Sequence, residues 1–106
     1  MKRFSIVLLF FFAACSSSPS ESEGRKFMED KGAETKVYKV KSFTKTNGVE
    51  GNRIYKMEYK TELECLRPGA VDIPDTIIEC QTAGQVGKVE GTLVFEKTEN
   101  GWRVKF

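Results

Sequence analysis

The chain has 106 residues, enough for one small domain, and contains no histidine, which removes the usual general base and the commonest metal ligand. Two of its 17 basic side chains, Lys2 and Arg3, lie at the extreme N-terminus, so the remainder balances 15 basic against 15 acidic groups. This neutral balance argues against nucleic acid as a partner, because phosphates require a basic surface.

The N-terminus has the pattern of an export signal. Lys2 and Arg3 precede an uncharged, largely apolar run at residues 4–14. As a helix this run would span about 16 Å, roughly half of the ~30 Å hydrocarbon core of a bilayer. A signal peptide therefore fits the run better than a permanent membrane span.

The run ends in the sequence FAAC at residues 12–15. This resembles the lipobox of bacterial prolipoproteins, although Phe12 stands where the family usually has Leu. The resemblance implies removal of residues 1–14, fatty acylation (palmitate or a related chain) of Cys15, and a lipid anchor in the membrane. Ser16 after the cysteine resembles outer-membrane sorting, with the domain facing the periplasm. The alternative is an ordinary secretory signal, cut within residues 16–18, that leaves Cys15 free.

The segment after the cysteine is polar and then turns amphipathic. Residues 16–24 (SSSPSESEG) offer nothing to bury, so we expect residues 15–24 to form a disordered tether to a domain at 25–106. Residues 25–33 (RKFMEDKGA) predict a short helix that ends at Gly32. Phe27 and Met28 should face the core.

From residue 35 on, apolar and polar side chains alternate with a period of two, which is typical of strands buried on one face. The clearest case is 53–65, where Tyr55, Met57 and Tyr59 fall on one face and lysines and glutamates on the other. One solvated face indicates an antiparallel sheet. The expected strands are at about 35–46, 49–65, 86–98 and 101–106.

Two Asn-Gly pairs mark the expected tight turns. Asn-Gly is the preferred centre of a type I′ hairpin. A two-residue loop at 100–101 pairs Phe95 with Phe106. The same motif at 47–48 predicts the first turn, although Gly51 allows a longer loop there. Both turns place the apolar residues on one face of a four-stranded meander.

Between the second and third strands lies a long connection, residues 66–85, with a short extended piece at 76–79. Cys65 and Cys80 flank this connection, and in an oxidising compartment we expect them to form a disulfide. In the chain-entropy model, a disulfide that closes a loop of about 15 residues stabilises the folded state by ~3 kcal/mol. A two-thiol metal site is the alternative, but its ligand set is incomplete without histidine, so no metal or other cofactor is expected.

Two further groups of side chains are candidates for a site. Six acidic residues can supply an acid–base pair or a calcium site: Glu58, Glu62, Glu64, Asp72, Asp75 and Glu79. Cross-strand pairing with lysines explains the first three of them. Aromatic residues either fill the core or line a ligand cup, whose candidate lining is Tyr38, Tyr55, Tyr59 and Trp102.

One helix followed by an antiparallel meander resembles a pared-down cystatin-like or NTF2-like α+β roll, in which the helix crosses a concave sheet and can leave a pocket. Residues 91–103 resemble the last hairpin of small lipoproteins with that fold. We expect a non-catalytic binding or interaction module at the cell envelope, with a small apolar molecule or an envelope protein as its partner. The alternatives are an inhibitor of an envelope-directed enzyme that acts through residues 66–79, and a small enzyme that uses carboxylates or tyrosine.

Overall fold

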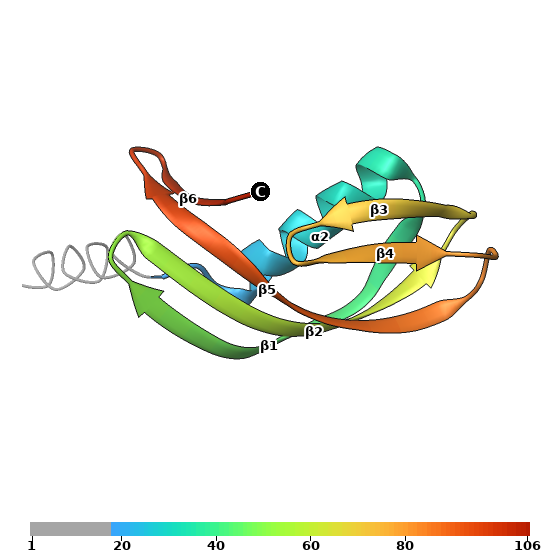
Figure 1. Cartoon of the computed structure of the whole chain (residues 1–106), viewed down its shortest axis with the longest axis horizontal. Helices are drawn as coiled ribbons and strands as arrows, with labels where there is room; N and C mark the ends of the chain where they lie inside the picture. Colours follow the sequence, from blue (N-terminus) through green and yellow to red (C-terminus); the bar gives the residue numbers. More distant parts are fainter. Residues whose placement is uncertain (1–17) are drawn as a thin grey trace, which may run out of the picture.

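The computed structural model describes residues 18–106, so the predicted signal peptide and Cys15 lie outside the described residues. The described chain is α+β, with a helix, a four-stranded antiparallel sheet and a two-stranded hairpin. The expected fold class and the four-stranded sheet are therefore confirmed. In Figure 1 the long sheet is curved, and both the helix and the hairpin lie over its concave side.

The strands of the main sheet pair in the order in which they occur along the chain. The helix is α2 (Glu21–Thr35), and the sheet has the strand order β1–β2–β5–β6. Its strands are β1 (Tyr38–Gly51), β2 (Ile54–Cys65), β5 (Val86–Thr98) and β6 (Gly101–Val104). The separate hairpin, β3 (Gly69–Ile73) and β4 (Thr76–Cys80), is inserted between β2 and β5.

The helix α2 is longer than expected at both ends. It begins at Glu21, whose carboxylate suits the positive end of the helix dipole, so residues 21–24 belong to the folded domain rather than to the tether. Gly32 does not end the helix, because it is packed against the next strand: a Cβ there would come within 2.6 Å of the Tyr38 carbonyl oxygen. The helix is closed instead by left-handed Lys36, whose N–H donates to the Gly32 carbonyl (2.8 Å).

The first hairpin turns at residues 52–53, so the turn predicted at 47–48 is wrong. Strand β1 continues through Gly48, with two register irregularities, and left-handed Arg53 (φ 62°) forms part of the turn. A Cβ at Gly48 would overlap the Tyr55 hydroxyl group. This glycine therefore makes room for a ring on the neighbouring strand.

The last turn lies one residue earlier than predicted, at residues 99–100. Phe95 consequently pairs with Val104 rather than with Phe106. Gly101, with φ 112°, follows the turn. The observed register differs from the predicted one by two residues, so every side chain keeps its expected face.

The segment expected to be a long irregular connection contains the β3–β4 hairpin. Val71 and Ile78 lie directly opposite each other in it, and both are buried. A disulfide joins Cys65 to Cys80, with a Cα–Cα distance of 5.7 Å, as predicted. The bond ties the last residue of β4 to the last residue of β2.

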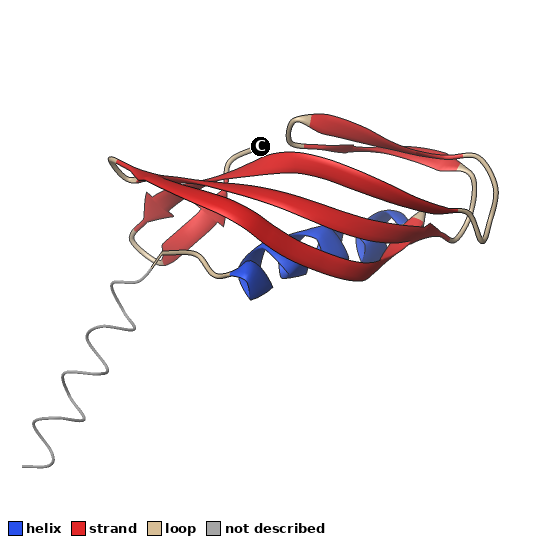
Figure 2. Ribbon diagram, turned by 90° about the horizontal axis from the view of Figure 1, so that it is seen from below, coloured by secondary structure: helices blue, strands red, loops and turns tan. Residues whose placement is uncertain are grey.

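The core lies between the sheet and the two elements that cover it. Figure 2, turned by 90°, shows the sheet from below, with α2 toward one border and the hairpin beyond the other. The helix packs mainly against β1. Met28 is fully buried and Phe27 partly buried, as expected. The other buried apolar side chains are Val37, Tyr38, Phe43, Tyr55, Met57, Tyr59, Leu63, Cys65, Val71, Ile73, Ile78, Cys80, Leu93 and Phe95.

Removing the disulfide should lower stability without changing the sheet. Replacing Cys65 and Cys80 together with Ser should reduce the free energy of unfolding by roughly 2–4 kcal/mol, because the cross-link no longer restricts the unfolded chain. Denaturant unfolding followed by circular dichroism measures the difference. Both proteins should lack residues 1–15, so that Cys15 and its expected lipid contribute nothing to the difference. Two free thiols in denatured, unreduced protein that lacks residues 1–15 would contradict the bond.

Candidate interaction surface

The aromatic residues predicted to line a ligand cup are spread along the core. Tyr38, Tyr55 and Tyr59 are 1%, 6% and 1% exposed. Tyr59 stacks on Phe43 with ring centroids 5.1 Å apart, and partly buried Trp102 contacts Tyr55 edge to face at 6.5 Å. Of the four predicted residues, Tyr38 borders a hollow of about 350 Å³ beside the C-terminal end of α2.

The hydroxyl groups of two core tyrosines differ in their surroundings. The Tyr38 hydroxyl donates to the Met28 carbonyl oxygen at 2.7 Å, whereas the buried Tyr59 hydroxyl has no hydrogen-bond partner among the described residues. Burial, with a smaller contribution from the Asp75 charge, raises the pKa of Tyr59 to about 12. Burial and the neighbouring Tyr59 raise the pKa of Tyr38 as well. Both phenols stay protonated near neutral pH, so neither is poised as a general base.

The acidic residues considered for a carboxylate site are dispersed. Glu58, Asp72 and Glu79 are exposed on different strands, and Asp75 is exposed at the tip of the hairpin. The Glu64 carboxylate lies 3.7 Å from the Lys39 ammonium group on β1. Within residues 18–106, no group of three Cys, Asp or Glu side chains is placed to hold a metal ion.

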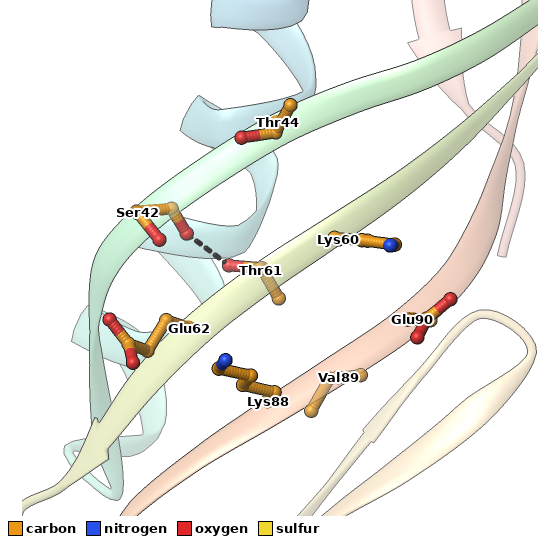
Figure 3. A pocket seen from close by; sticks show the side chains of 8 residues that line it. All are labelled: Ser42, Thr44, Lys60, Thr61, Glu62, Lys88, Val89 and Glu90. Carbon is orange, nitrogen blue, oxygen red and sulfur yellow. Dashed lines mark hydrogen bonds between the residues drawn. The ribbon is translucent and has the colours of Figure 1, made fainter.

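A polar hollow of about 510 Å³ lies on the solvent face of the sheet, shown in Figure 3. Lys60 is opposite Glu90 in the register, and Glu62 is opposite Lys88. Beside them, the Thr61 hydroxyl donates to a β1 carbonyl at 2.6 Å. The four charges alternate in sign, so this hollow has no net preference for anions or cations. The alternation along each strand was visible in the sequence, but the facing pairs depend on the β2–β5 register.

The β3–β4 hairpin is held rigidly at its base and presents apolar side chains to solvent. Besides the disulfide, the Leu66 N–H donates to the Val37 carbonyl (2.6 Å) and the Arg67 guanidinium to the Thr35 carbonyl (2.8 Å). Ile77 is 58% exposed and Leu66 is 45% exposed. Single exposed apolar side chains are common on protein surfaces, so Ile77 is a candidate contact point because it lies on a fixed element and borders a crevice. The sequence marked the segment through its cysteines but did not predict its strands.

A small crevice separates the hairpin from β5. Its volume is about 150 Å³, and its apolar walls include Leu63, Ile77, Ile78 and Val89. Pockets for small-molecule ligands usually measure about 300–1,000 Å³. The crevice therefore suits one side chain of a protein partner better than a whole small ligand.

Comparison of the chain with protein-family models, curated proteins and solved structures found no match. Among residues 18–106, no helix combines the length and the apolar character needed to cross a bilayer.

Removing each buried hydroxyl should have opposite effects on stability. Tyr38→Phe should lower the free energy of unfolding by about 1 kcal/mol, because the buried Met28 carbonyl loses its donor. Tyr59→Phe should leave stability unchanged or raise it, because the hydroxyl that it removes is buried without a partner. Parallel urea denaturation of both variants measures the difference. Equal destabilisation by the two substitutions would contradict this assignment.

Proposed function

We propose that the chain is a bacterial lipoprotein, anchored in the cell envelope through acylated Cys15, whose domain is a non-catalytic interaction module. The disulfide supports export, because such bonds persist in oxidising compartments and are rare in the cytosol. The lipobox-like sequence at residues 12–15 supports the anchor and, with Ser16, an outer-membrane location facing the periplasm. The helix against a curved sheet supports a reduced form of the cystatin-like or NTF2-like roll.

The observation that carries the interaction role is the exposed Ile77 on a hairpin that the disulfide holds in place. Its base is joined to β2 by a covalent bond, and Ile77 is exposed on it. A surface that is already ordered loses little conformational entropy on binding, which favours affinity. Since the neighbouring crevice is small, an envelope protein is a better partner for this surface than a small apolar ligand.

A second candidate function is inhibition of an envelope-directed enzyme through residues 66–79. The tip of the hairpin favours it, because Pro74 and left-handed Asp75 (φ 76°) form a narrow turn on a disulfide-fixed stem. Pro74 and Asp75 share the lining of a hollow of about 540 Å³ with strands of the main sheet, so an enzyme would contact the turn together with this part of the sheet. Loss of inhibition when residues 74–75 are replaced, with binding retained, would single out this mechanism.

The anchor is tested by the mass of the mature protein. Protein extracted from membranes should begin at Cys15 and carry fatty acyl chains on that residue, since several chains are needed for a firm anchor. Intact-mass measurement with fragmentation locates the added mass. A soluble product that begins within residues 16–18 would exclude the lipoprotein assignment.

The interaction role is tested by photo-crosslinking in cells. A photoreactive phenylalanine derivative at Ile77 should give a discrete cross-linked protein, because this side chain projects from the fixed hairpin. The same derivative at Lys41, an exposed position on β1 at the opposite border of the sheet, is the control and should give none. No product from Ile77, or the same products from both positions, would contradict the proposed surface.

A further inference from the structure

The predicted anchor lies close to the folded domain along the chain. Pro19, two residues before α2, is fully buried, so the folded part begins no later than this residue. Residues 16–18 alone separate it from Cys15, and four fully extended residues span at most about 14 Å. In Figures 1 and 2 the described chain begins at the end of the sheet where β1 turns into β2. An acylated Cys15 would hold this end of the domain at the surface of a bilayer.

In this half of the domain, lysine side chains lie over aromatic rings. The Lys45 ammonium group is 5.2 Å from the centre of the Tyr55 ring, and the Lys97 ammonium group is 5.4 Å from that of Trp102. The two rings contact each other edge to face, so the two pairs are continuous. The Lys45 N–H also donates to the Glu21 carboxylate at 2.7 Å, which places this group beside the start of α2.

The ring of Phe106 extends this group toward the helix. Phe106 contacts Phe27 of α2 edge to face, with ring centroids 6.5 Å apart, and the Lys31 ammonium group lies 4.8 Å from its centre. With 68% of its surface exposed, Phe106 is the most exposed large apolar side chain among residues 18–106. We define the aromatic–lysine cluster by its six members: Lys31, Lys45, Tyr55, Lys97, Trp102 and Phe106.

The cluster has the composition that proteins present to the interface between water and lipid. Tryptophan and tyrosine are enriched at this level of a bilayer, because their rings are partly apolar and partly polar. Lysine places its stem along apolar surface while its ammonium group stays in water. Glu21, Glu34 and Glu50 accompany the three lysines, so the charges nearly balance. The rings rather than net charge would therefore provide the contact with lipid.

We propose that the aromatic–lysine cluster contacts the lipid bilayer, with Trp102 and Phe106 at the level of the headgroups. The contact rests on the proposed function, since acylated Cys15 brings this end of the domain to the membrane. Val89, which lines the crevice together with Ile77, is eight residues from Lys97, or about 26 Å along an extended strand. Ile77 therefore stands clear of the bilayer and remains accessible to an envelope protein.

The single tryptophan of the chain makes this contact measurable by fluorescence. The mature acylated protein is reconstituted in vesicles of phosphatidylcholine whose acyl chains carry bromine near the headgroup, because bromine quenches tryptophan on contact. Trp102 should lose most of its emission relative to vesicles of the unbrominated lipid. The matched control is the double variant Trp102→Phe, Ile77→Trp, whose only tryptophan lies on the hairpin and should keep its emission.

A longer tether separates binding by the cluster from proximity imposed by the anchor. A flexible Gly-Ser insertion of about 20 residues after Ser17 has a root-mean-square reach of about 25 Å, which lets the domain leave the surface. Quenching of Trp102 should persist in this protein, because the rings bind lipid. In the same protein Phe106→Ser should reduce the quenching, since the most exposed ring is lost. Val86→Ser, which removes an exposed apolar side chain at the other end of β5, should not.

Four outcomes would overturn the proposal. They are unquenched Trp102, equal quenching of a tryptophan at position 77, loss of quenching with the longer tether, and equal effects of the two serine substitutions. Trp102 shielded from aqueous iodide yet not quenched by bromine would make a protein the occupant.

The mass of the same sample separates this proposal from the proposed function. Unquenched Trp102 in protein that is acylated on Cys15 refutes the bilayer contact and leaves the lipoprotein assignment standing. Protein without acyl chains refutes the assignment itself, on which the contact rests.

Discussion

The close approach of tyrosine rings to glycines sets the spacing of the whole domain. Three such contacts occur: Tyr55 over Gly48, Tyr59 over Gly91, and Tyr38 against Gly32. A Cβ at any of these glycines would collide with a ring or with the main chain. The first two contacts join neighbouring strands and the third joins the helix to the sheet, so together they determine how tightly both layers pack. The rings are consequently buried, and large aromatic side chains dominate the energetics of a small core.

The same contacts explain which parts of the fold were predictable from sequence. Alternation assigned the faces of β2 and β5 correctly, because burial of one face dictates a period of two. Glycine was misleading, since a glycine signals either an unusual φ or a lack of space. Gly32 and Gly48 were interpreted as residues that adopt an unusual φ, but both occur where a neighbouring residue leaves no room for a Cβ. The end of the helix and the first turn were therefore misplaced. Only the structure identifies which side chain needs the space.

The β3–β4 hairpin was the least predictable part, because tertiary contacts rather than local propensity determine it. Strands β3 and β4 are short, and a two-stranded hairpin is marginal by itself in water. It is stabilised by the bond between Cys65 and Cys80 and by burial of Val71 and Ile78. The cysteines were recognisable in the sequence, and so was their pairing. The exposure of Ile77 follows from the register of the hairpin, which the cysteine spacing does not specify.

The helix and the hairpin cover the two borders of the sheet in different ways. Helix α2 packs along β1, and its Glu21 carboxylate accepts one hydrogen bond from the Lys45 N–H on that border. The hairpin lies beside β5 but shares no strand pairing with it, and the disulfide holds it there independently of the main sheet. Since the hairpin is fixed from β2, residues 86–93 of β5 need no second strand partner to hold either element in place. The covalent bond thus lets a short hairpin cover the core of a small domain without strand pairing to the main sheet.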